Sequence, residues 1–158
     1  MKINILWCLT FVIFNSCGHE PVKVVFPSTI HPEIEQYMQA YEYMAVVYVD
    51  SVTCTSCKFN SLTMWKHFEK NLKKNNTGVL FLIRNSDEQS VIEALKYNKL
   101  TFPFIFDKEG KFKAVNEIFK FVRDNVFVMD RNKNVVMAES PIENEQTWQM
   151  FLNRVKKK

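Results

Sequence analysis

Two cysteines, Cys54 and Cys57, are the residues of this sequence best suited to chemistry. They follow an apolar run and precede a helical pattern, so we expect Cys54 just before a helix and Cys57 within its first turn. Backbone N–H groups at a helix N-terminus stabilise a thiolate, and such settings lower a cysteine pKa from about 8.5 to roughly 3.5–7.5. The spacing also lets Cys57 reach the sulfur of Cys54 and resolve a mixed disulfide. We therefore predict Cys54 as the attacking nucleophile, Cys57 as the resolving thiol, and Lys58 as a nearby cation that favours the thiolate.

Other interpretations of this cysteine pair stay open. A structural disulfide is one, since disulfides persist in oxidising compartments, although so short a loop gains little entropic stabilisation. A zinc site needs about four ligands, and the three histidines show no paired spacing, so we predict no bound metal. A copper chaperone would want a nearby ligand such as Met64 or Met129, yet methionine in these positions is more typical of a core. We therefore predict no cofactor beyond the redox-active disulfide of Cys54 and Cys57.

Composition limits the functional classes further. The chain has 158 residues, 47% of them hydrophobic, which suits one globular domain with a substantial core. Its 3 glycines lie too far apart in the sequence to share one phosphate-binding loop. The formal net charge of +4 is spread along the sequence, so we expect no nucleic-acid partner. Asp107, Glu109 and Asp130 fall at turn tips, where we expect solvated carboxylates rather than a catalytic pair.

The N-terminal residues predict an export signal. Lys2 supplies a positive start, and residues 5–14 form an apolar run that is too short to span a membrane. The junction at Cys17 is similar to a bacterial lipoprotein signal, in which that cysteine becomes the lipid-modified first residue. An ordinary secretory signal cleaved nearby is the alternative. We therefore assign residues 1–16 to a signal peptide, 17–31 to a lipid-anchored tether with an entry strand, and 32–158 to the domain.

Hydrophobic periodicity predicts an α/β domain. Helical spacing is expected from Pro32 onward, over the apolar stripe of residues 59–72, and over residues 87–97 and 144–155. Apolar runs predict strands at residues 22–26, 45–49, 79–83 and 101–106. Two further segments, residues 104–115 and 127–138, each show an apolar strand, an acidic turn and a return strand, so we predict two hairpins.

The apolar strand, the segment Cys54-Thr55-Ser56-Cys57-Lys58 and the helix after it resemble the core motif of the thioredoxin-like superfamily. The hairpin at residues 125–138 is similar to the one that ends the sheet of membrane-anchored periplasmic members, the TlpA- and ResA-like proteins. The resemblance covers residues 32–158 and implies a thioredoxin-like fold, with a central mixed β-sheet flanked by helices and a C-terminal hairpin and helix. It also implies a thiol–disulfide oxidoreductase whose partners are exported protein thiols or disulfides, or a membrane electron donor.

Some positions depart from the pattern of that family. Thr53 replaces the usual aromatic residue before the first cysteine, and Tyr48 occupies roughly the position of a buried acid. The family also has a cis-proline that faces the cysteine pair. Alignment of the hairpin puts Asp124 or Asn125 there and leaves Pro103 as an edge proline, which is the alignment we prefer. Thr53 and, in the other alignment, Pro103 are the residues that the resemblance implies for substrate binding.

These features together predict a lipid-anchored, periplasm-facing protein that performs thiol–disulfide exchange through Cys54 and Cys57. The competing hypothesis is a non-catalytic binding or assembly lipoprotein of the same fold, which keeps the cysteines as a labile clasp. A copper chaperone is a third and less favoured hypothesis.

Overall fold

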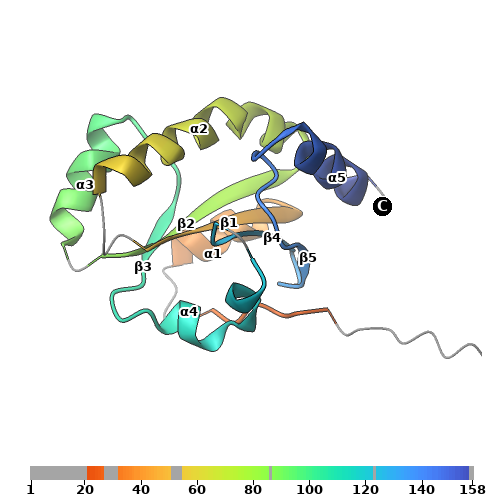
Figure 1. Ribbon diagram of the computed structural model, residues 1–158, viewed down its shortest axis with the longest axis horizontal. Helices are drawn as coiled ribbons and strands as arrows, with labels where there is room; N and C mark the ends of the chain where they lie inside the picture. The colour runs from red at the N-terminus through yellow and green to blue at the C-terminus, as the bar shows by residue number, and fades with distance from the viewer. Residues whose placement is uncertain (1–20, 27–31, 51–54, 86, 123, 157–158) are drawn as a thin grey trace, which may run out of the picture.

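The computed structural model describes residues 21–26, 32–50, 55–85, 87–122 and 124–156, with the backbone alone for residues 55–61 (Figure 1). Within these residues a five-stranded sheet, in the order β3-β2-β1-β4-β5, lies between two layers of helices. The strands are β1 (Tyr43–Asp50), β2 (Thr77–Arg84), β3 (Phe104–Phe106), β4 (Val126–Asp130) and β5 (Val135–Met137). The helices are α1 (Pro32–Gln39), α2 (Thr55–Lys74), α3 (Glu88–Tyr97), α4 (Lys111–Val115) and α5 (Glu145–Val155), with a 3-10 helix η1 (Glu117–Lys120).

The sheet is mixed, as the resemblance implied. β1 pairs in parallel with β2, and β2 pairs in parallel with β3, whereas β4 is antiparallel to both β1 and β5. The register sets Val47 of β1 level with Phe81 of β2 and Val126 of β4. The central strands β1 and β2 are buried over nearly their whole length. Burial on both faces explains why each strand is a continuous apolar run in the sequence rather than an alternating one.

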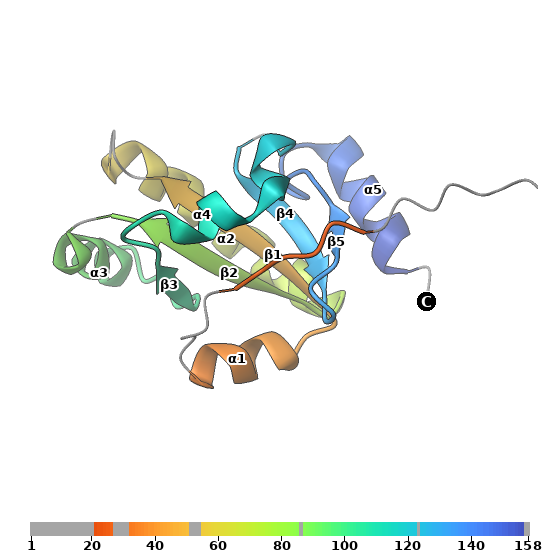
Figure 2. The same ribbon diagram turned by 90° about the horizontal axis from the view of Figure 1, so that it is seen from below.

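Alternate residues of β1 face two separate hydrophobic clusters, because successive side chains of a strand point to opposite faces. Ala45 and Val47 belong to the cluster that packs against α2, α3 and α5. Val46 and Tyr48 belong to the other cluster, which packs against α1, α4 and η1. Figure 1 shows α2, α3 and α5 along one side of the sheet, and Figure 2 shows α1 and α4 on the other.

The structure confirms most of the predicted elements. The predicted helices correspond to α1, α2, α3 and α5, the strands predicted at residues 45–49, 79–83 and 101–106 to β1, β2 and β3, and the C-terminal hairpin to β4 and β5. The predicted entry strand at residues 22–26 forms an isolated antiparallel bridge between Lys23 and Asn134. Two hydrogen bonds from the Asn116 side chain also fix this segment. Its oxygen accepts a hydrogen bond from the Val25 N–H at 2.7 Å, and its nitrogen donates one to the Val25 carbonyl at 2.8 Å.

The return strand predicted at residues 112–115 is wrong, because this segment forms helix α4. Gly110 precedes the helix with a φ of 69°, a left-handed conformation that costs glycine little. The Asp107 carboxylate then accepts a hydrogen bond from the Phe112 N–H at 3.1 Å. This turn buries Phe112 completely beneath the sheet, whereas a return strand would have extended the sheet beyond its edge strand β3.

Replacing Phe112 by alanine is expected to lower the free energy of unfolding by about 3–5 kcal/mol, because the ring packs in the core against Tyr48 and Phe119. Phe121→Ala is the matched control, since Phe121 is 70% exposed and its loss should change the free energy by no more than about 0.5 kcal/mol. Urea unfolding followed by circular dichroism measures both variants. Equal stability of the two variants would contradict the position of α4 beneath the sheet.

Candidate functional site

The connection between β1 and α2 carries the predicted cysteines. Thr53 and Cys54 lie outside the described residues, as do Cys17 and the predicted signal peptide. Helix α2 begins at Thr55, directly after Cys54 in the sequence, and the backbone of Cys57 and Lys58 lies in its first turn. The N-terminus of α2 therefore occurs at the cysteine pair, after the carboxyl end of a buried central strand, as the sequence predicted.

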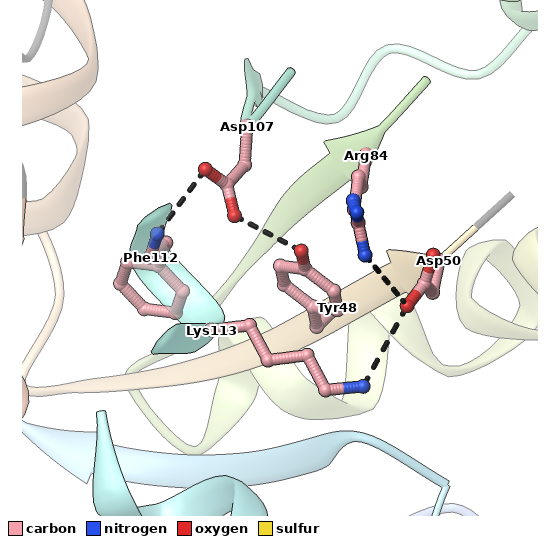
Figure 3. A network of polar contacts seen from close by, with 6 residues as sticks. All are labelled: Tyr48, Asp50, Arg84, Asp107, Phe112 and Lys113. Atoms are coloured by element: carbon pink, nitrogen blue, oxygen red, sulfur yellow. Dashed lines mark hydrogen bonds and ion pairs between the residues drawn. The ribbon is translucent and has the colours of Figure 1, made fainter. Parts of the chain in front are cut away.

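Asp50 ends β1, and two cations hold its carboxylate. Its Oδ2 lies 3.7 Å from Nη1 of Arg84, on β2, and 3.6 Å from Nζ of Lys113, on α4 (Figure 3). Its Oδ1 is buried and accepts no hydrogen bond from the described residues. Three elements thus meet at the last residue of β1. Asp50 Oδ1 can still accept a hydrogen bond from a further donor.

Asp107 is buried at the same end of the sheet, so the prediction that it is a solvated turn residue is wrong. It is 7% exposed, and its Oδ2 accepts a hydrogen bond from the Tyr48 hydroxyl at 2.9 Å (Figure 3). Its Oδ1 accepts the Phe112 N–H described above. Both carboxylate oxygens therefore have donors, which compensates for the burial of this side chain. Glu109 is exposed at the turn, as predicted, and Asp130 is half-buried in the β4–β5 turn, where it accepts the Asn134 N–H.

Tyr48 supplies the hydroxyl at the position where the resemblance implies a buried acid. Burial raises the pKa of the Tyr48 phenol, and the hydrogen bond to Asp107 raises the pKa further, so the phenol stays protonated and donates. The Lys113 ammonium lies 5.4 Å from the centre of the Tyr48 ring. The carboxylate that pairs with the Tyr48 hydroxyl therefore comes from the loop after β3. Asp107 directly follows an apolar strand in the sequence, but this placement alone does not distinguish it from a solvated turn acid.

Pro103 directly precedes the edge strand β3 and lies level with the middle of β1 and β2 along the strand direction. Its carbonyl accepts the Phe81 N–H at 3.1 Å, and Phe81 is level with Val47, three residues before the end of β1. No cis peptide bond occurs among the described residues, which include Pro103. The structure therefore has Pro103 at a sheet edge and does not bring it to the carboxyl end of β1. Its role in substrate binding stays a prediction.

Asp124 and Asn125, one of which the hairpin alignment puts at the position of the family's proline, lie beside the carboxyl end of β1. The carbonyl of Asn125 accepts the Tyr48 N–H at 2.9 Å. Both residues have left-handed backbones, with φ of 50° for Asp124 and 54° for Asn125. Aspartate and asparagine are among the residues that tolerate this conformation, and such turns concentrate at functional sites.

A cavity of about 490 Å³ opens at this end of the sheet, and we call it the β1–α2 groove. Its apolar lining comes from β1, β4, α2 and the segment before α5: Val47, Val49, Met64, Trp65, Val126 and Ile142. Its polar lining comes from Asp50, Asp124, Asn125, Ser140 and Glu143, and the remaining contributor is Tyr48. The volume falls in the range of small-ligand pockets, about 300–1,000 Å³. The groove therefore adjoins the strand end from which the chain leads to the cysteines.

The methionines considered as copper ligands lie in different settings. Met129 is 2% exposed in the cluster beneath the sheet, whereas Met64 is 51% exposed at the groove. Among the described residues no group of three or more histidine, cysteine, aspartate or glutamate side chains could hold a metal ion.

Within the same part of the chain, no helix has the length and apolarity needed to cross a membrane.

Comparison with solved structures identifies the fold. A protein assigned as thiol:disulfide interchange protein DsbE from Chlorobium tepidum superposes with a TM-score of 0.57 at 16% identity, covering 76% of this chain and 84% of that chain. The thioredoxin domain of a thiol-disulfide oxidoreductase from Bacteroides vulgatus gives 0.54 at 14% identity, covering 75% and 82%. This chain has a thioredoxin-like fold. StoA from Bacillus subtilis is also similar, with a TM-score of 0.50 at 17% identity and coverage of 68% and 82%. No protein-family model matches the sequence of this thioredoxin-like chain, and no curated protein does.

Tyr48→Phe is expected to lower the free energy of unfolding by about 1–3 kcal/mol at pH 7, because the buried Asp107 carboxylate loses a donor. Tyr97→Phe is the matched control. Because Tyr97 is 87% exposed, this substitution should leave the free energy of unfolding almost unchanged. Urea unfolding at fixed pH measures both.

The same two variants also show how much Tyr48 contributes to the dependence of folding stability on alkaline pH. The raised Tyr48 pKa stabilises the folded protein fully below the unfolded value of about 10, and this stabilisation is lost as pH rises above 10. Wild type and Tyr97→Phe should therefore lose stability more steeply than Tyr48→Phe between pH 10 and about 12. Identical alkaline slopes for all three proteins would contradict the buried hydrogen bond.

Proposed function

We propose that this protein performs thiol–disulfide exchange through Cys54 and Cys57. One observation carries the proposal: α2 begins directly after Cys54 and includes Cys57 in its first turn, at the carboxyl end of a central strand of a thioredoxin-like fold. A cysteine at such a helix N-terminus is favoured as thiolate, the nucleophilic form. The compared structures support the proposal, because their names describe thiol:disulfide interchange and oxidoreductase proteins.

The reaction divides into two exchange steps. The Cys54 thiolate attacks one sulfur of a substrate disulfide, so that a Cys54–substrate bond forms, the substrate S–S bond breaks, and the leaving substrate thiolate takes a proton. The Cys57 thiolate then attacks Cys54 Sγ, which forms the Cys54–Cys57 disulfide and releases the second substrate thiolate. The substrate has gained two electrons and the cysteine pair has lost two. The reverse sequence oxidises a substrate dithiol, and a thiol partner such as a membrane electron donor would reduce the pair again.

We further propose that this chemistry takes place at the cell envelope. The apolar run at residues 5–14 and the junction at Cys17 support a lipoprotein signal, which would tether the domain to a membrane facing the periplasm. Exported proteins would then supply the thiols and disulfides. The competing function is a non-catalytic binding or assembly lipoprotein of the same fold.

Substituting Cys57 by serine is expected to trap mixed disulfides, because Cys54 can still attack a substrate and nothing resolves the adduct. Cells producing Cys57→Ser should accumulate high-mass species that dithiothreitol removes, visible on non-reducing gels. Cys54→Ser is the matched control and should give at least about tenfold less adduct, since the predicted nucleophile is missing. The absence of adducts from Cys57→Ser, together with no reduction of insulin by the wild type, would favour the non-catalytic function.

A further inference from the structure

The β1–α2 groove combines an apolar interior with an acidic opening. Val47 and Val126 lie level on adjacent strands, and Trp65 from α2, 4% exposed, packs over the same face of the sheet. Ile142, from the segment before α5, adds a further apolar contact. A side chain entering the groove would therefore bury aliphatic carbon against four elements of the fold, which favours binding in proportion to the area removed from water.

The charged side chains among the described lining residues are all acidic. Asp124 and Glu143 both line the groove, both are exposed, and neither forms an ion pair with another described residue. Asp50 also lines it, but its carboxylate is already held by Arg84 and Lys113 (Figure 3). The described lining residues include no lysine or arginine, although the whole chain carries a net charge of +4. The described lining of the groove is thus acidic, on a protein of net positive charge.

We propose that the β1–α2 groove binds a lysine or arginine side chain of the polypeptide that reacts at Cys54, an assignment that rests on the thiol–disulfide exchange proposed above. These two side chains have a long aliphatic stem and a cationic end, and they commonly bury the stem while the charge stays in water. The stem matches the interior of the groove, and the cation matches Asp124 and Glu143 at its opening. Because the groove lies at the end of β1, from which residues 51–54 lead to α2, the bound residue would lie near the reacting cysteine of the substrate.

The proposal is tested with redox-inert peptides and the purified protein. Three peptides carry serine in place of the reacting cysteine and differ in one neighbouring residue, which is lysine, leucine or glutamate. An NMR titration that follows the Trp65 indole N–H reports the affinity at the groove itself. We expect the lysine peptide to bind about fivefold more tightly than the leucine peptide, and the difference in affinity between the lysine and glutamate peptides to be larger still. Both differences should decrease as the salt concentration is raised.

The protein variants isolate the two carboxylates. The double variant Asp124→Asn/Glu143→Gln removes both charges, and asparagine tolerates the left-handed backbone of position 124, so the fold should persist. Its preference for lysine over leucine should fall below about twofold. Glu117→Gln is the matched control, because Glu117 is an exposed carboxylate paired with Lys120 and lies outside the groove, and it should keep the wild-type preference.

The outcomes separate this proposal from the proposed function. Equal affinities for the three peptides, an unchanged Trp65 signal, or a preference that survives in the double variant would overturn the groove assignment. Reduction of hydroxyethyl disulfide, a small neutral reagent, by the pre-reduced protein tests the chemistry without the groove, because the Cys54–Cys57 dithiol supplies the two electrons and becomes a disulfide. Turnover of this reagent with equal peptide affinities would reject the groove alone. Failure of turnover with a retained lysine preference would reject thiol–disulfide exchange and, with it, the link between groove and Cys54.

Discussion

The hydrogen bond from the Tyr48 hydroxyl to the buried Asp107 carboxylate joins the central strand to the connection that follows β3. A carboxylate that is 7% exposed must have donors, and Asp107 obtains them from β1 through Tyr48 and from α4 through the Phe112 N–H. Three elements are thereby fixed at one end of the sheet. The same end holds Asp50 between Arg84 and Lys113, so the chain leaves β1 toward the cysteines from a strand whose last residues are tied to their neighbours.

β1 separates two environments because its side chains alternate. Tyr48 and Asp50 form the polar contacts with Asp107, Arg84 and Lys113, whereas Val47 and Val49 give the groove part of its apolar lining on the α2 side. The carboxyl end of one strand therefore carries polar contacts on one face and an apolar surface on the other. Such a division would suit the proposed exchange reaction, in which the cysteine pair must be held in place and still admit a macromolecular substrate.

The sequence was sufficient for features that depend on local pattern. Continuous apolar runs predicted β1 and β2, and the position of Cys54 and Cys57 between a strand and a helix predicted the N-terminus of α2. Features that depend on pairing between distant segments could not be predicted from the sequence. The burial of Asp107 follows from the parallel register that sets the end of β3 beside the ends of β2 and β1, and no local pattern distinguishes it from a solvated turn acid. Helix α4 was missed for the same reason, because its first turn depends on the Asp107 carboxylate. The groove was also missed, since its lining comes from four separate parts of the chain.

The proposed function depends most on Cys54 and Cys57 being a reversible redox couple rather than a structural disulfide. Its most direct test is the reduction potential of the pair, measured by equilibration with glutathione and alkylation of the free thiols. Catalytic couples of thiol–disulfide exchange proteins lie between about −120 and −270 mV, and we predict a single two-electron transition in that range. A potential below about −300 mV, typical of structural disulfides, would contradict the account, as would a pair that forms no disulfide at all.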